Sequence, residues 1–100
     1  LTLAVPEKAQ VTWRAARLPL ESIEWSNVRS LAEDDSGHVY VLDAAAKSVH
    51  RFDTRGQLVR TYGREGSGPG EFRSPGWISL MKDTLFVEDP QNGRLTAFST

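Results

Sequence analysis

The feature that most constrains the fold of this chain is an internal repeat. Residues 39–43 (VYVLD) align with residues 85–89 (LFVED) at an offset of 46. The same offset aligns Val49 with Leu95 and Phe52 with Phe98. A period in the forties, built from short strands, is typical of β-propeller blades, each a four-stranded antiparallel meander. A β-sandwich also has short strands but need not repeat its own sequence, so the repeat favours propeller blades.

Short β-branched and aromatic runs closed by turn residues occur along the chain, whereas helical periodicity is weak. The strands predicted in the first unit are Val28–Ala32, His38–Leu42, Ser48–Phe52 and Leu58–Tyr62. Those predicted in the second unit are Trp77–Leu80, Thr84–Glu88 and Arg94–Phe98. Five of the eight glycines lie between residues 63 and 76, which predicts a loop between the units. The sequence therefore predicts an all-β fold.

Composition excludes several classes of function. The 100 residues include 12 Lys and Arg and 13 Asp and Glu, a net charge of -1, which gives no electrostatic reason to bind DNA. No cysteine is present, which excludes disulfides, thiolate metal sites and cysteine nucleophiles. Apolar runs such as Ala44–Ala46 are too short to span a membrane. The first residues lack a signal-peptide pattern, so we expect a processed or excised chain.

Several separated motifs resemble a known repeat. Leu31–Asp43 resembles the first half of an NHL repeat. The second half of the repeat, and its link to the next repeat, are matched by Ser48–Asp53, Gly56, Tyr62-Gly63 and Gly68–Phe72, which resemble the NHL pattern. The resemblance covers about residues 26–99 and is strongest to bacterial six-bladed propellers with NHL-like blades, which are often exported or lipid-anchored. It implies a periplasmic, extracytoplasmic or lipid-anchored parent protein.

This resemblance implies four segments. Residues 1–25 would hold a ring-closing strand at 11–17, and 26–63 would form the first blade. Residues 64–74 would be a Gly-rich inter-blade loop, and 75–100 a partial second blade. Because a six-bladed ring needs on the order of 270 residues, we expect a fragment of a longer propeller. The alternative is a short chain that closes the ring as three copies.

Blade topology predicts which loops share a face. In a four-stranded meander, the turn between the second and third strands and the link to the next blade lie at one end, and the other turns lie at the opposite end. Propellers generally bind ligands on such loop faces. The candidate binding residues on the first of these faces are Asp43, Lys47, Arg64, Arg73, Asp89 and Asn92.

Each candidate has a structural interpretation beside the functional one. Asp43 and Asp89 occupy equivalent repeat positions, where an aspartate builds an Asx turn, although carboxylates converging on a channel metal are the alternative. No cofactor is predicted from these residues, and a divalent metal in the full propeller stays open. The glycine-rich loop lacks the Gly-Lys-Ser/Thr of a phosphate loop, so a blade connector is favoured.

The histidines are expected to serve packing or to lie at the surface, and the aromatic residues are expected to serve packing. His38 and His50 have no partner histidine at ligand spacing. Trp77 and Phe86 are expected in inter-blade packing. Phe52 and Phe98 are expected at equivalent core positions.

These observations favour a non-enzymatic scaffold that binds a protein or another extracytoplasmic ligand. The alternative is part of a metal-dependent propeller hydrolase resembling gluconolactonases. An RNA-binding NHL module is disfavoured, because Glu65 and Glu71 dilute the basic and aromatic residues around Arg64.

Overall fold

A computed structural model of the chain describes residues 27–100, so the predicted ring-closing strand at 11–17 lies outside the described residues. Within that range, seven strands form two antiparallel sheets, each paired in chain order. The first sheet contains β1 (Val28–Glu33), β2 (Val39–Asp43), β3 (Ser48–Phe52) and β4 (Leu58–Tyr62). The second contains β5 (Trp77–Met81), β6 (Thr84–Asp89) and β7 (Arg94–Ser99). The all-β prediction is confirmed, and each of these strands lies within one residue of its predicted bounds.

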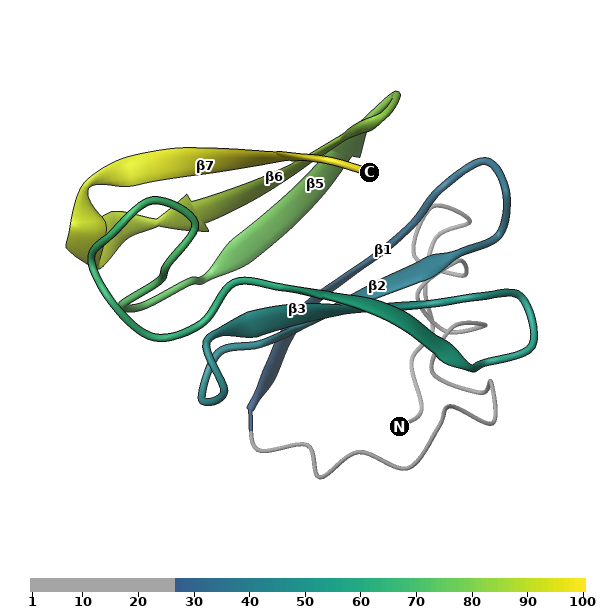
Figure 1. Cartoon of the computed structure of the whole chain (residues 1–100), viewed down its shortest axis with the longest axis horizontal. Helices are drawn as coiled ribbons and strands as arrows, with labels where there is room; N and C mark the ends of the chain where they lie inside the picture. The colour runs from purple at the N-terminus through teal and green to yellow at the C-terminus, as the bar shows by residue number, and fades with distance from the viewer. Residues whose placement is uncertain (1–26) are drawn as a thin grey trace, which may run out of the picture.

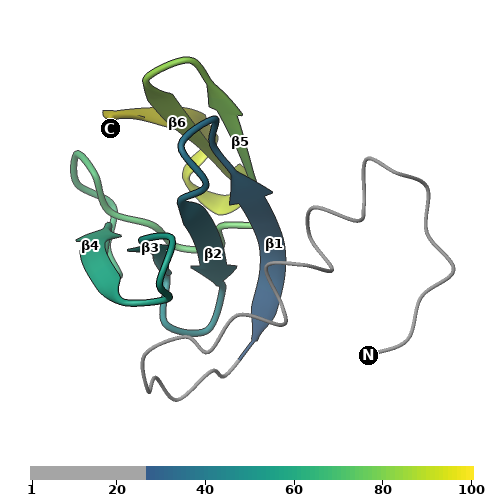
Figure 2. The ribbon, with the colours of Figure 1, turned by 90° about the vertical axis from the view of Figure 1, so that its right-hand side faces the viewer.

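The two sheets lie side by side, and their first strands are neighbours. Figures 1 and 2 show β1 and β5 next to each other, which is the arrangement of inner strands in successive propeller blades. A hydrogen bond from the backbone N–H of Ile78 to Ser30 Oγ at 3.3 Å joins these two strands. Each unit of the sequence repeat therefore forms one sheet, and the two sheets pack against each other.

β2 is buried along its whole length because its alternating side chains enter two different cores. Tyr40 and Leu42 point toward the second sheet, whereas Val39 and Val41 join Phe52 on the other face of the first sheet. The core between the sheets comprises Tyr40, Leu42, Val49, Tyr62, Phe72, Ile78, Leu85 and Val87. Burial of these apolar side chains on both sides of the contact holds the sheets together.

Phe98 extends this core through aromatic contacts. Its ring lies 5.4 Å from the Tyr62 ring and 5.9 Å from the Phe72 ring, both in edge-on geometry. Phe98 thus packs toward the sheet that precedes its own. Phe52 lies in the apolar cluster on the equivalent face of the first sheet and is fully buried.

Trp77 and Phe86 do not enter the contact between these two sheets, so their expected inter-blade packing concerns the opposite face of the second sheet and stays a prediction. Ile78 enters the core between the sheets, so Trp77, its neighbour on β5, points to the opposite face. Trp77 is 54% exposed, and Met81 and Leu95 on the same sheet are 66% and 59% exposed. Phe86 is partly buried and is not a member of that core. The strand alternation, and not residue size, decides which side chain faces the first sheet.

Two turns of the first sheet are built in the same way by an aspartate and a glycine. Asp34 Oδ1 accepts the backbone N–H groups of Ser36 and His38, and Gly37 has a φ of 84°. Asp53 Oδ1 accepts two backbone N–H groups in the same pattern, and its turn also ends on a glycine. These Asx turns explain why both strand pairs reverse where the sequence places Asp and Gly.

The turn after β6, which contains the Asn92-Gly93 pair, has a different form. Residues Pro90–Asn92 make one turn of 3-10 helix, and Gly93 follows in the left-handed region with a φ of 66°. The Gly93 N–H donates to the Pro90 carbonyl at 2.9 Å. Proline fixes its own φ and needs no N–H partner at the start of a helical turn, which explains the short helix.

Candidate functional site

The loops predicted to form a binding face gather at one end of the molecule. The β2–β3 turn, the link from β4 to β5 and the connection after β6 all lie at this end (Figure 1). We call it the loop end and define it as residues 43–48, 63–76 and 89–94. It contains all six predicted site residues: Asp43, Lys47, Arg64, Arg73, Asp89 and Asn92.

Asp43 and Asp89 are buried and hold backbone N–H groups of the segment that leads into their own sheet. Asp43 Oδ1 accepts the N–H of Asn27, just before β1, at 3.0 Å. Asp89 accepts the N–H groups of Ser74 at 2.8 Å and Arg73 at 3.0 Å, just before β5. We call this arrangement the carboxylate clamp. The two aspartates, 46 residues apart, therefore share both the residue type and the hydrogen-bonding pattern.

The second clamp is reinforced by an amide from the short helix. Asn92 Nδ2 donates to Asp89 Oδ2 at 2.7 Å and to the Gly66 carbonyl at 3.0 Å. Burial alone would raise the pKa of Asp89. The N–H groups of Ser74 and Arg73, followed by the Asn92 amide, favour the charged form more strongly and lower this pKa below its ordinary value. The carboxylate is therefore ionised, and both of its oxygens are engaged.

Arg94 and Glu71 hold the glycine-rich link in one shape. The Arg94 guanidinium donates to the carbonyls of Ser67 and Glu71, both at 3.1 Å, and to the Gly68 carbonyl. Glu71 Oε1 accepts the Gly68 N–H at 2.9 Å, and Glu71 Oε2 lies 2.8 Å from Arg64 Nε. The hydrogen bonds from Gly68 and Arg64 lower the pKa of Glu71. The glycine-rich blade connector is thus held by several hydrogen bonds and one ion pair.

The start of this link requires a glycine. Gly63 has a φ of 83°, and a Cβ added there would lie 2.1 Å from a ring carbon of Phe72. Phe72 is fully buried in the core between the sheets. The link therefore both connects the sheets and fills the space between them.

Three predicted site residues present cationic groups at the loop end. Arg64 and Arg73 are exposed, and the Arg64 side chain is 82% accessible. Lys47 Nζ donates to the Arg73 carbonyl at 2.8 Å, and Arg73 Nε donates to Ser67 Oγ at 2.7 Å. Asp43 and Asp89 turn toward backbone N–H groups, Glu71 pairs with Arg64 as well as with the Gly68 N–H, and Glu65 is exposed beside Arg64. The arrangement can bind a partner through fixed cationic groups on a preformed surface.

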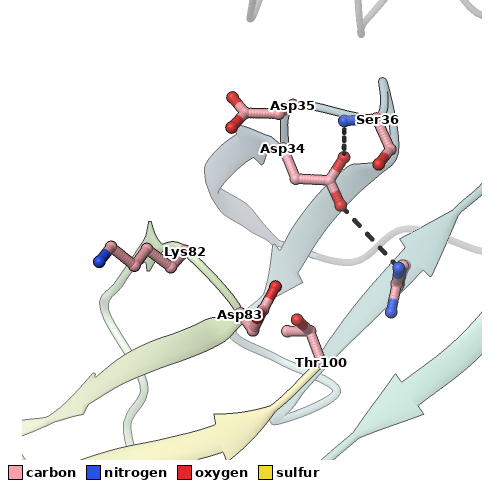
Figure 3. A pocket seen from close by; sticks show the side chains of 7 residues that line it. Asp34, Asp35, Ser36, Lys82, Asp83 and Thr100 are labelled. Atoms are coloured by element: carbon pink, nitrogen blue, oxygen red, sulfur yellow. Dashed lines mark hydrogen bonds and ion pairs between the residues drawn. The ribbon is translucent and has the colours of Figure 1, made fainter.

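A pocket that the sequence analysis did not assign lies at the opposite end, between the two sheets. It is lined by Asp34, Asp35, Ser36, Arg51, Lys82, Asp83 and Thr100, and its volume is about 420 Å³. Figure 3 shows that the β1–β2 turn and the β5–β6 turn form two of its sides. The sequence places both turns at one end, but it does not show that they enclose a space. We call this the inter-sheet pocket.

Two features are absent from residues 27–100, the part of the chain that the structure describes. No group of three or more histidine, aspartate and glutamate side chains in this range is arranged to hold a metal ion. None of its helical segments has the length and hydropathy needed to cross a membrane.

Comparison with known proteins agrees with this architecture. Residues 18–99 match the model of a family described as "6-bladed beta-propeller". A stretch of 75 residues is 36% identical to peptidylglycine alpha-amidating monooxygenase of Rattus norvegicus, covering 68% of this chain and 8% of that protein. The fold also resembles a crystal structure from Bacteroides fragilis named "Putative exported protein", with a TM-score of 0.72 and 23% identity. That match covers 82% of this chain and 24% of the other, and it shows the fold alone.

Proposed function

Because the chain belongs to the six-bladed β-propeller family, we propose that it supplies two neighbouring blades of a non-enzymatic binding scaffold. Residues 26–63 form the first blade in this proposal, 64–74 the inter-blade loop and 75–100 part of the second blade. A protein partner docks on the loop end. The partner segment is acidic, because the exposed guanidinium groups of Arg64 and Arg73, with the half-buried Lys47 beside them, meet it first.

One observation carries the proposal: the glycine-rich link is held in place before any partner arrives. Arg94 donates to three carbonyls of the link. Within the link, Glu71 accepts the Gly68 N–H, and Asn92 donates to the Gly66 carbonyl. A surface that is already ordered loses little conformational entropy on binding, which favours affinity. Arg64 and Arg73 are thereby presented at fixed positions.

The same geometry favours a scaffold over a hydrolase that binds a metal through its repeat aspartates. The carboxylates of Asp43 and Asp89 already accept backbone N–H groups, so a metal ion would compete with those donors. This chain spans only 8% of the monooxygenase and 24% of the B. fragilis protein. The activities that those names describe are therefore not carried over to it. The word "exported" in the name of the B. fragilis protein supports an extracytoplasmic location for this scaffold.

The test uses a fluorescently labelled glutamate-rich peptide as the probe, titrated at low and at physiological salt. The variant Arg64→Ala/Arg73→Ala should weaken binding by about three- to tenfold, since each exposed charge contact contributes up to about 1 kcal/mol. The matched control Arg29→Ala/Arg55→Ala removes two exposed arginines outside the loop end. Equal weakening by the control, or no binding of the peptide at low salt, would contradict the proposal. Circular dichroism confirms that each variant is folded.

A further inference from the structure

The inter-sheet pocket lies at the end of the molecule opposite the proposed docking surface and is large enough for a small molecule. Its volume of about 420 Å³ falls in the range of small-ligand sites. One side is the β1–β2 turn of the first sheet, and the other is the β5–β6 turn of the second. The pocket exists only because the two sheets are stacked, so its lining combines residues that are distant in the sequence.

A cationic group on the first sheet faces this pocket with unused donors. Arg51 Nε donates to His38 Nδ1 at 3.0 Å, and Arg51 Nη1 donates to the Tyr62 hydroxyl at 3.4 Å. The guanidinium also lies 5.3 Å from the centre of the Tyr40 ring, which fixes its plane. Arg51 Nη2 lies 3.9 Å from Asp34 Oδ2, an ion pair that is too long for a hydrogen bond, so Nη2 donates no hydrogen bond to residues 27–100.

Asp34 does not fully satisfy that guanidinium, because its oxygens serve its own turn. Asp34 Oδ1 accepts the N–H groups of Ser36 and His38, and Asp34 Oδ2 accepts the Tyr40 hydroxyl. The side chain of Arg51 is 20% exposed and lines the pocket. A planar guanidinium with free N–H groups is the donor that carboxylates fit best.

Anionic groups stand on the other sides of the pocket. The carboxylates of Asp35 and Asp83 have no hydrogen-bond or ion-pair partner among the described residues, and both residues are exposed. Figure 3 shows the Asp83 carboxylate directed into the space between the two turns, whereas the Lys82 side chain extends away from it. The Asp83 carbonyl accepts the Thr100 N–H at 2.9 Å, which fixes the position of this turn.

We propose that the inter-sheet pocket binds a small zwitterion that carries one carboxylate and one ammonium group. The carboxylate pairs with Arg51 Nη2, and the ammonium group pairs with Asp83 and Asp35. A ligand with only a carboxylate is repelled by the aspartates of the lining, and a ligand with only an amine leaves the Nη2 donor of Arg51 unused. The lining therefore selects molecules in which both charges are present.

The test is an NMR titration of this chain with four probes: glycine and γ-aminobutyrate as zwitterions, and acetate and methylammonium as single-charge controls. At least one zwitterion should shift the backbone signals of Ser36 and Asp83 and the Nε signal of Arg51. Its affinity should exceed that of both single-charge probes by about tenfold. Equal affinity for acetate or methylammonium, or no shift with any probe, overturns the proposal.

Substitutions locate the binding site. Asp83→Asn removes an exposed charge and should weaken zwitterion binding by about tenfold while the chain stays folded. Glu88→Gln removes an exposed carboxylate outside the pocket and should leave the affinity unchanged. Unchanged binding by Asp83→Asn overturns the proposal. The loop-end variant Arg64→Ala/Arg73→Ala should bind the zwitterion normally, so the two proposals fail independently.

Discussion

Replacement of Asp89 by asparagine tests the carboxylate clamp. Asp89 accepts three hydrogen bonds, from the N–H groups of Ser74 and Arg73 and from the amide of Asn92. Hydrogen bonds to a charged acceptor each contribute about 1.5–3 kcal/mol. Asparagine keeps one acceptor oxygen but turns an NH2 group toward a donor on the other side. At neutral pH we therefore expect Asp89→Asn to lower the free energy of unfolding by about 2–4 kcal/mol.

Urea unfolding followed by circular dichroism measures this loss. Glu88→Gln is the matched control, because Glu88 is the adjacent residue and is exposed; it should change the free energy of unfolding by less than about 0.5 kcal/mol. An Asp89→Asn effect as small as that of the control would refute the clamp as a source of stability. Equal slopes against urea concentration would show that both variants unfold from equally compact states.

The effect should also depend on pH with a defined sign. The pKa of Asp89 is lowered in the folded chain, so its charge contributes stability above the ordinary aspartate pKa of about 3.9. That contribution is lost as the pH falls through the lower, folded-state value. The difference between the natural chain and Asp89→Asn should therefore be full at neutral pH and shrink in acid. A difference that stays constant down to the acid limit would mean that the charge is not responsible.

Two further substitutions test packing. Phe52→Ala should destabilise the chain by about 3–5 kcal/mol, as for other buried aromatic truncations, because Phe52 is fully buried; an effect near zero in urea unfolding would show that its cluster is not a core. Gly63→Ala should cost about 2–4 kcal/mol in thermal or urea unfolding, because it combines a φ of 83° with a Cβ placed 2.1 Å from the Phe72 ring. Gly76→Ala, which meets nothing within 4 Å, is its control and should unfold almost like the natural chain.

The sequence predicted the strands well because the relevant information is local. Residues 39–43 carry apolar groups on both alternating faces, and Asp34 and Gly37 mark the turn before them. The offset of 46 then predicted that the pattern would be used twice. Local alternation and turn chemistry are sufficient for this level of description.

The candidate site was predictable only in part. The repeat placed Asp43 and Asp89 at equivalent positions, and an Asx role was one expected outcome. Their bonds to Asn27 and Ser74 depend on contacts across 16 and 15 residues, which no local pattern reports. The inter-sheet pocket needs Arg51 and Asp83 to meet across the contact between sheets, and a repeat does not specify which side chains of different units face one space. The repeat likewise does not specify which of the two sheet faces Trp77 occupies.

The exposed face of the second sheet has a consequence for assembly. Trp77, Met81 and Leu95 offer an apolar surface on the side away from the first sheet, whereas Ile78 and Leu85 fill the side that touches it. A unit with complementary front and back faces joins head to tail, and such contacts continue as an open filament unless the rotation between units closes a circle. In a six-bladed protein the sixth contact returns to the first blade. Ring closure is thus a safeguard against polymerisation, and destabilising the closure should expose the faces of the first and last blades to aggregation.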